Sequence, residues 1–380
     1  MKVLFIGEYS NVYTELSKEL KSRGINTFSI SDGDYFKKYP TDYLLENVPV
    51  YNNVIAKAYR YFTFRLGLSG LLKFLKHWKK IKPHLQGNDV VQLINPVALT
   101  GFGSVVNLLL LHYLKNHNSR IFLSALGDDY YICDWFIKND HRSDYYRTPL
   151  LKNILLPGWA AKYKYCLFYK RLNDYAIKIS NRIIPGLNCY REAYIWTEKV
   201  TEVIPFPISS SKISQPIEFE DYKKVVIFHG WQKGNEKRKG NDVYDRVIKR
   251  VVEKYGDRVD YKVVQSVPFE EYLKLFSSSH IFIDQLYLEE YGYNALLGMA
   301  AGKVVFSGYN KEYLKKYPNY NGSQIGVFAE LDEDKLFGQF CDLIEHTSLI
   351  HQISLNAVNH VINNHASPIV CDMYCKYWFA

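Results

Sequence analysis

The sequence predicts an α/β fold with two doubly wound parallel sheets, and three observations support this prediction. Short, almost wholly apolar runs alternate with amphipathic helical runs, as expected for buried parallel strands and the helices that cover them. One polar, serine-rich stretch interrupts the alternation, which then starts again. With 380 residues, 47% of them hydrophobic and 23% charged, the chain is long enough for two domains with a core each.

The first half contains an ordered series of apolar runs. The expected strands are residues 2–7, 25–31, 88–95, 119–127, 181–186 and 201–207. Helical runs lie between them, beginning with residues 14–24. Strands that are apolar on both faces must be covered on both faces, which is typical of a Rossmann-like sheet. We therefore assign residues 1–207 to an N-terminal Rossmann-like domain.

The second half repeats this architecture after residues 208–222, which are polar and serine-rich and form the expected linker. The expected elements are strands at 223–230, 260–266, 280–285 and 303–308, with an amphipathic helix at 241–256. Residues 223–365 are therefore assigned to a C-terminal Rossmann-like domain. Residues 366–380 are expected to form a C-terminal helix that packs back on the N-terminal domain.

Charge and cysteine content restrict the class of protein. The net charge of +9 favours anionic partners such as nucleic acid, an anionic membrane surface or anionic substrates. Because the sequence has no zinc finger, aromatic RNA-binding motif or basic tail, nucleic acid is not expected. The six cysteines include no CxxC pair, which favours free thiols in a reducing cytosol, and hence a cytoplasmic location.

A basic amphipathic helix is expected within residues 67–83. Its apolar face contains Leu68, Leu71, Leu72, Leu75 and Trp78, and its basic face contains Lys73, Lys76, Lys79 and Lys80. One interpretation is an ordinary surface helix whose apolar face packs on the first sheet. The other is a helix that rests on anionic lipid at the inner face of a membrane.

The loop at residues 229–242 predicts an anion site. Arg238 and Lys239 directly precede a helix that begins at Gly240-Asn241. Free N–H groups at a helix start and fixed positive charges both attract anions. The loop lacks the spacing of a nucleotide-binding P-loop, which argues against an ATPase. A solvated, charged loop is the alternative.

A second candidate loop lies at residues 288–294. Glu289 and Glu290 precede Gly292, and an alanine- and leucine-rich helix begins near Asn294. The helix is expected to be buried nearly all round, so that only its N-terminus meets solvent. The glutamates could hold sugar hydroxyls, and the helix start could hold a phosphate. A simple turn at the glycine is the alternative.

Two loops in the first half also carry polar residues. Asp128 and Asp129 follow a strand, where carboxylates suit hydroxyl binding or proton transfer, although a helix cap is the expected role of one of them. The loop with Tyr9 and Asn11 follows the first strand and contains one glycine. A dinucleotide-binding fingerprint needs three glycines at fixed spacing, so NAD binding is not expected.

These motifs resemble GT-B glycosyltransferases, and most closely glycosyltransferase family 4. The basic residues before Lys-Gly in KRKGND match the family's order, and LEEYGYNALLGMAAGKVV follows the layout of its acidic motif. Glu289 falls on the first acid, and Gly292 on the loop glycine. Leu297 falls where the family has a second acid that binds ribose. Ribose would then be held otherwise, for example by Glu290.

The resemblance implies a hexosyltransferase-like enzyme that uses a nucleotide-diphosphate sugar, retains anomeric configuration and needs neither a metal nor another cofactor. The implied donor-binding residues are Gly230, Arg238, Lys239, Glu289, Glu290, Gly292, Tyr293 and Asn294. The implied catalytic residues are Glu289, Lys239 and Asp128. The implied acceptor-binding residues are Asp128, Asp129, Tyr9 and Asn11. The donor would lie in a cleft between the two domains.

The acceptor implied by the resemblance is a saccharide or a lipid-linked saccharide, in the synthesis of surface polysaccharide or another glycan. Three alternatives stay open. The chain could be a sugar-nucleotide epimerase or a phosphorylase, because both classes use related folds. It could be a non-catalytic nucleotide-sugar-binding protein, which the leucine at 297 motivates. It could also be a lipid-surface protein in which the sugar site is vestigial.

Overall fold

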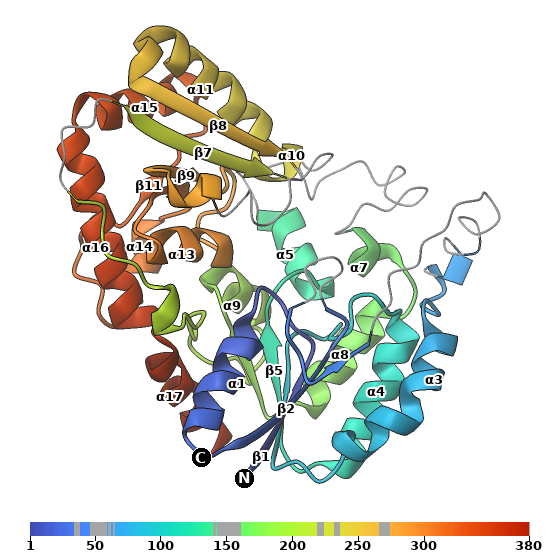
Figure 1. The fold of residues 1–380 in the computed structure, drawn as a ribbon. Coiled ribbons are helices and arrows are strands. Elements are labelled where there is room, and N and C mark those ends of the chain that lie inside the picture. Colours follow the sequence, from blue (N-terminus) through green and yellow to red (C-terminus); the bar gives the residue numbers. More distant parts are fainter. Residues whose placement is uncertain are drawn as a thin grey trace. The chain divides into compact units, whose positions relative to one another are not determined.

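The computed structural model describes residues 1–33, 39–45, 59, 62–63, 65–139, 142, 161–218, 224–231, 236–265 and 274–379 (Figure 1). Contacts divide the chain into two compact units. The first unit combines Met1–Pro207 with Val370–Ala380, and the second is Ile208–Ile369. Each unit is built around its own parallel sheet.

Among the described residues, the first unit contains a six-stranded sheet in the order β3-β2-β1-β4-β5-β6, with every pair parallel. Its strands are β1 (Lys2–Ile6), β2 (Asn26–Ser31), β3 (Tyr43–Leu44), β4 (Val90–Leu93), β5 (Ile121–Ala125) and β6 (Arg182–Pro185). Ile6 lies opposite Ile30 on one side and Leu93 on the other. The central strands β4 and β5 are buried along their whole length, as their largely apolar sequence predicts.

Helices accompany this sheet along the chain. They are α1 (Val12–Ser22), α3 (Leu71–Ile81), α4 (Ser104–His117), α5 (Tyr130–Asn139), α7 (Ala161–Tyr165), α8 (Tyr169–Ile179), α9 (Asn188–Tyr194) and α17 (Ser367–Trp378). In Figure 1, α3, α4 and α8 run beside one another. Among the described residues, none of the helices combines the length and apolar character that crossing a bilayer requires.

The strand expected at residues 201–207 is absent from the structure. This segment instead runs alongside β6 and makes isolated hydrogen bonds to it. The Thr201 amide donates to the Ile183 carbonyl at 2.9 Å, and the Ile204 amide donates to the Pro185 carbonyl at 3.0 Å. Pro205 and Pro207 have no amide hydrogen, so a continuous ladder cannot form there. The apolar pattern was therefore correct about burial and wrong about the strand.

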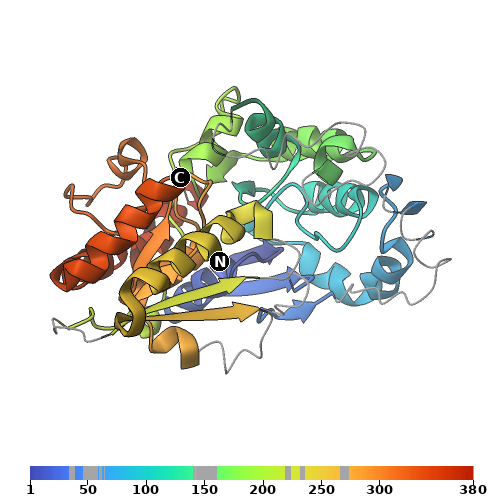
Figure 2. The same cartoon turned by 90° about the horizontal axis from the view of Figure 1, so that it is seen from above.

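The second unit contains a five-stranded parallel sheet among its described residues, in the order β11-β10-β9-β7-β8. Its strands are β7 (Val225–Trp231), β8 (Val259–Gln265), β9 (Ile281–Ile283), β10 (Val304–Ser307) and β11 (Val327–Phe328). Its helices are α10 (Glu236–Lys239), α11 (Asn241–Tyr255), α13 (Tyr293–Ala300), α14 (Lys311–Leu314), α15 (Glu333–Glu345) and α16 (Thr347–His365). Figures 1 and 2 show α11 running alongside β7 and β8, where Val247 and Val251 are buried in the core.

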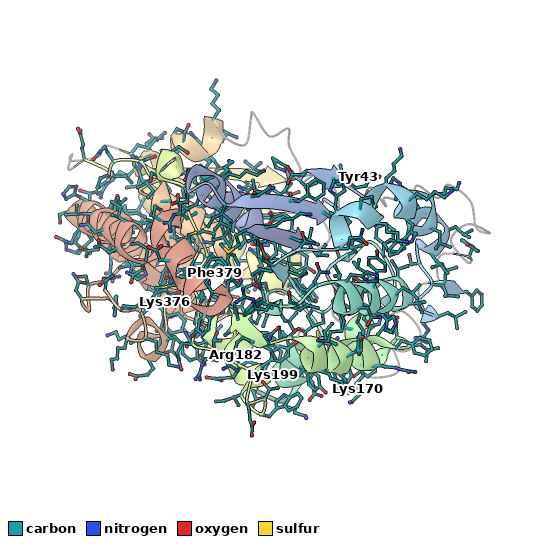
Figure 3. All side chains as sticks on the ribbon, turned by 90° about the horizontal axis from the view of Figure 1, so that it is seen from below. Tyr43, Lys170, Arg182, Lys199, Lys376 and Phe379 are labelled. Carbon is teal, nitrogen blue, oxygen red and sulfur yellow. The ribbon has the colours of Figure 1, made fainter. Side chains whose placement is uncertain are left out.

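The last helix, α17, completes the core of the first unit. The Trp378 side chain is fully buried, with its ring 6.0 Å from that of Phe5 and 5.2 Å from that of Tyr374. Its indole N–H donates to the Gln92 side-chain oxygen at 2.8 Å. Figure 3 shows the face on which this helix ends, with its neighbours Lys376 and Phe379 labelled. The C-terminal segment is thus part of the core of the first unit.

Shortening Trp378 to alanine should lower the free energy of unfolding by about 3–5 kcal/mol, because a large buried ring leaves a cavity. Urea denaturation followed by circular dichroism measures this change. Trp378→Phe is the matched variant: it keeps most of the ring but removes the donor to Gln92, so a loss of about 1–3 kcal/mol is expected. A Trp378→Ala protein as stable as the native one would contradict the assignment of α17 to this core.

Candidate functional site

Helix α13 starts at an open position in the second unit. No side chain caps its N-terminus, and Gly292 occupies the cap position. A Cβ atom added at Gly292 would have no neighbour within 4 Å, and Asn294 is exposed. The remainder of the helix is mostly buried. The first amides of α13 are therefore available to an anion, because the first turn of a helix has no internal acceptors for them.

A buried carboxylate, Asp284, organises the residues around this helix start. It directly follows β9, and its side chain is only 1% exposed. One oxygen accepts from the Lys239 ammonium at 2.7 Å and from the Asn294 amide at 3.1 Å. The other accepts from the Ser307 hydroxyl at 2.9 Å. Asp284 therefore fixes Lys239 beside the N-terminal turn of α13.

Backbone packing also fixes the position of Lys239. Its carbonyl accepts from the Leu286 amide at 2.9 Å. The next residue, Gly240, has a φ of 73°, and a Cβ atom there would lie 2.7 Å from the Leu286 side chain. Glycine is thus required for this close approach. The Lys239 side chain remains 40% exposed, so its ammonium can contact a ligand as well as Asp284.

The other residues of the basic loop differ in environment. Arg238 is half-buried on α10, whereas Lys237 on the same helix is exposed. Gly230 lies inside β7, next to the fully buried His229. Burial lowers the pKa of His229 to about 4, so its imidazole is neutral at physiological pH. Residues 232–235 of the loop, which include Lys233, lie outside the described residues.

The two glutamates of the loop at residues 288–294 differ in solvent exposure. Glu289 is exposed and accepts from the Asn310 side-chain amide at 2.7 Å. Glu290 is buried and forms a backbone bridge with Tyr309. A Cβ atom at Gly308 would lie 2.3 Å from the Leu288 carbonyl, so the loop passes very close to the end of β10. Glu289 is therefore better placed than Glu290 to bind a ligand from solvent.

Leu297 is half-buried, which differs from the burial expected on all sides of α13. It lies one turn after the exposed Asn294, so the two share a helix face. The expectation that α13 is buried nearly all round is therefore wrong at this position. The face that could meet a ribose is apolar at this position.

A tyrosine in the loop at residues 288–294 is hydrogen-bonded to two buried histidines. The Tyr291 hydroxyl lies 2.9 Å from Nε2 of His360 and 2.8 Å from Nε2 of His365, and all three residues are buried. Burial, with a smaller contribution from His365, lowers the pKa of His360 to about 3. The neutral imidazole of His360 can therefore act as a hydrogen-bond partner of the hydroxyl. No local pattern in the sequence indicates this cluster, because its members are far apart along the chain.

In the first unit, hydrogen bonds join the loops that leave the carboxyl ends of several strands. The Tyr9 hydroxyl, after β1, donates to the Val97 carbonyl at 3.1 Å. Asn95, after β4, donates to the Leu126 carbonyl at 2.8 Å. Asp32, after β2, accepts from the Gly101 amide at 2.5 Å. These contacts gather the polar loops at the sheet edge where open parallel sheets bind ligands.

Asp128 and Asp129 have different partners. Asp129 is fully buried, accepts from the Ile132 amide at 2.9 Å and from the Tyr194 hydroxyl at 2.6 Å, and so caps α5. Burial raises the pKa of Asp129 to about 7. Asp128 is almost as buried, and its carboxylate interacts electrostatically with the Lys162 ammonium.

Lys162 and Asp32 were not identified from the sequence. Burial lowers the pKa of Lys162 to about 8, and the nearby Asp128 and Asp32 carboxylates oppose this shift. An acid directly after an apolar strand is a usable signal, and it would have identified Asp32 and also Asp284. No pattern indicates Lys162, because its role depends on residues distant in the sequence.

The two residues after β1 that were expected to bind the acceptor, Tyr9 and Asn11, have different environments. The Tyr9 ring lies 3.2 Å from the position of a Cβ atom added at Gly127, so Tyr9 adjoins the loop that carries Asp128. Asn11 has a φ of 69° and donates to the Glu15 carboxylate at 2.7 Å, at the start of α1. Tyr9 therefore joins the polar edge of the sheet, whereas the side chain of Asn11 is committed to its own helix.

No model of a protein family matches this sequence, and no curated protein does either. Solved structures match over nearly the whole chain. Sucrose-phosphate synthase from Thermosynechococcus elongatus has 13% identity and a TM-score of 0.60, covering 100% of this chain and 98% of that one. HepE from Anabaena in complex with UDP-glucose has 12% identity and a TM-score of 0.57, covering 99% of each. UDP-GlcNAc 2-epimerase from Neisseria meningitidis, bound to UDP-GlcNAc, has 12% identity and a TM-score of 0.52, covering 99% and 100%.

These matches establish the fold. The chain has a GT-B fold made of two parallel-sheet, Rossmann-like α/β units, which confirms the fold class expected from the sequence. At these identities the matches define the architecture and not the activity. Within the described residues, no three His, Cys, Asp or Glu side chains gather in a way that could hold a metal ion.

The raised pKa of Asp129 predicts a pH-dependent stability. The folded state keeps this proton up to about pH 7, whereas the unfolded state loses it near its ordinary value of 3.8. The Asp129 contribution to the free energy of unfolding should therefore fall as pH rises from 4 to 7, by at most roughly 1.4 kcal/mol per unit. Asp129→Asn keeps an acceptor for the helix cap but cannot titrate. Urea denaturation at several pH values should show a shallower decline in this variant, and equal slopes would refute the prediction.

Proposed function

We propose that this protein is a glycosyltransferase of the family 4 type that transfers a hexose from a UDP-sugar to a saccharide or lipid-linked saccharide, with retention of configuration. The proposal depends on one observation above all. Asp284 holds the partly exposed ammonium of Lys239 beside the uncapped start of α13, at the carboxyl end of the second sheet. The complexes of HepE with UDP and UDP-glucose support the choice of a uridine donor.

In this proposal the residues of the second unit bind and activate the donor. When the bond between sugar and diphosphate breaks, negative charge grows on the diphosphate oxygens. Lys239, Arg238 and the first amides of α13 stabilise that charge, which removes the need for a metal ion. The exposed carboxylate of Glu289 accepts a hydrogen bond from a hydroxyl of the donor sugar. The half-buried Leu297 supplies an apolar contact where related enzymes bind ribose through an acid.

The acceptor is proposed to contact the polar edge of the first unit. Asp128 adjoins Tyr9 through the Gly127 loop, and the buried Lys162 ammonium lies in the same electrostatic environment. Together these groups offer hydrogen-bond acceptors and a donor to sugar hydroxyls. We place the reaction in the synthesis of surface polysaccharide or another glycan. Asp129 supports this site indirectly, because it caps the helix that follows.

Sugar-nucleotide epimerisation is the second candidate, because structures of UDP-GlcNAc 2-epimerases match the full chain. The two activities differ in their products. An epimerase inverts C2 of the GlcNAc unit and forms no bond to an acceptor. A transferase releases UDP and forms a new glycosidic bond to an acceptor. Proton NMR of UDP-GlcNAc incubated with the protein, with and without saccharide acceptors, separates the two.

The proposed role of Lys239 is tested with Lys239→Gln. Glutamine retains a donor for Asp284 but removes the positive charge, so turnover of the UDP-sugar should fall by about 10²-fold to 10³-fold. Lys237→Gln is the matched control, because it makes the same charge change at an exposed position of the same helix. UDP should also raise the melting temperature of the native protein more than that of Lys239→Gln. Near-normal turnover in Lys239→Gln, or equal losses in both variants, would disprove this assignment.

We further propose that α3 brings the protein to the inner face of a membrane. The helix buries Phe74 and Ile81. Leu72 and Leu75 are instead 70% and 51% exposed, which does not fit a face packed wholly on the sheet. Exposed leucines beside a lysine cluster suit an anionic lipid surface, where a lipid-linked acceptor would be found.

Replacing Lys73, Lys76, Lys79 and Lys80 with glutamine should release the protein from anionic vesicles. Each lysine near such a surface contributes about 1 kcal/mol, and salt should weaken the attachment. Co-sedimentation at low and high salt measures it. The matched control replaces four exposed lysines of the second unit, Lys224, Lys249, Lys274 and Lys315. If the native protein never sediments with anionic vesicles at low salt, the membrane proposal is wrong.

A further inference from the structure

The first unit has a surface pocket of about 390 Å³ between α5 and the end of α9. Its described lining residues are Tyr131, Asp134, Trp135, Lys138, Asn139, Glu192, Ala193 and Trp196. The donor-binding proposal uses none of them. Its volume lies within the range of small-molecule sites in proteins.

Aromatic rings form one part of this pocket. Trp196 is 59% exposed, yet its indole N–H donates to the Ala193 carbonyl at 3.1 Å. Its ring lies 4.9 Å from the Tyr131 ring at an angle of 50°. The Tyr131 hydroxyl donates to Asp174 at 2.5 Å, and Lys170, labelled in Figure 3, binds the same carboxylate at 2.9 Å. The exposed indole is thus held in a fixed orientation.

Charged and amide groups surround the rings. Asp134 accepts from Lys138 at 2.7 Å and also from Lys164. Burial alone would raise the pKa of Asp134, but the two lysines hold it below its usual value, so the carboxylate is ionised. Glu192 and Asn139 add a second carboxylate and an amide to the lining. Hydrogen-bond acceptors and donors therefore lie beside a rigid aromatic surface.

We propose that this pocket binds a neutral saccharide chain. A pyranose ring has a face of C–H bonds, which is attracted to the negative face of an indole or phenol ring. Its hydroxyls lie around the ring edge, where carboxylates, an amide and an ammonium can each bind them. Two carboxylates in the lining disfavour an anionic ligand such as a phosphate or an anionic lipid headgroup. An ordered aromatic surface also loses little conformational entropy on binding.

This proposal goes beyond the transferase function, because it requires neither a nucleotide nor a transfer reaction. The pocket would hold saccharide residues that are not at the reacting position, and so increase the affinity for longer chains. Binding at this pocket can therefore be present or absent whether or not the protein transfers sugar.

The test is a titration with cellohexaose, maltohexaose and chitohexaose in the absence of any nucleotide, followed by saturation-transfer NMR and tryptophan fluorescence. At least one hexasaccharide should bind, and Trp196→Ala should weaken it by about tenfold, equivalent to about 1.4 kcal/mol. Ile195→Ala is the matched control, because Ile195 is equally exposed at 59%, directly precedes Trp196 and does not line the pocket. Its affinity should equal that of the native protein.

A second variant, Glu192→Gln, keeps the shape of the lining and should also weaken binding, which guards against a folding defect in Trp196→Ala. Urea midpoints of all variants are compared with that of the native protein. The proposal is overturned if none of the three saccharides binds at about 10 mM. At that concentration even weak binding, with a binding free energy of only a few kcal/mol, would be detected. It is also overturned if Ile195→Ala weakens saccharide binding as much as Trp196→Ala does. A Trp196→Ala protein that keeps its saccharide affinity but binds anionic vesicles more weakly would overturn it as well.

Discussion

The candidate site depends on one buried carboxylate, Asp284, and on the hydrogen-bond donors that surround it. An ionised carboxylate removed from water is costly unless donors replace its hydration. Asp284 obtains them from Lys239, Asn294 and Ser307, which belong to three different elements of the second unit, α10, α13 and β10. Holding one carboxylate therefore fixes the relative positions of a basic loop, a helix start and a strand end. Asp284 thereby holds the Lys239 ammonium next to the start of α13, whose Asn294 side chain it also binds.

Several features could be predicted from the sequence because they depend on local patterns. Buried parallel strands require continuous apolar runs, and these located most of the strands, including β1, β4 and β9. The same criterion failed at residues 201–207, where prolines prevent a ladder, and it overstated the burial of Leu297. Asp284 and Asp32 do carry a local signal, because each is an acid directly after a strand. The contact of Tyr291 with His360 and His365 had no such signal, because it joins residues 69 and 74 positions apart.

The two units differ in how far their polar residues are separated in sequence. The main groups of the second-unit site lie between residues 238 and 310, so their order alone resembled a known motif. In the first unit, Asp32, Asp128 and Lys162 come from distant parts of the chain and meet only after folding. The proposed donor site is therefore visible as a linear motif. The features that would select an acceptor, including the aromatic pocket around Trp196, are visible only in three dimensions.

The location of Trp378 has a consequence for synthesis of the protein. The first unit contains both the beginning of the chain and residues 370–380, so the chain passes between the units twice. Trp378 is translated 373 residues after its ring partner Phe5. The strands of the first unit are made before the second unit, but the core of the first unit cannot be completed until α17 has been made. A nascent chain should therefore expose an incomplete apolar core in its first unit until α17 is available to fill it.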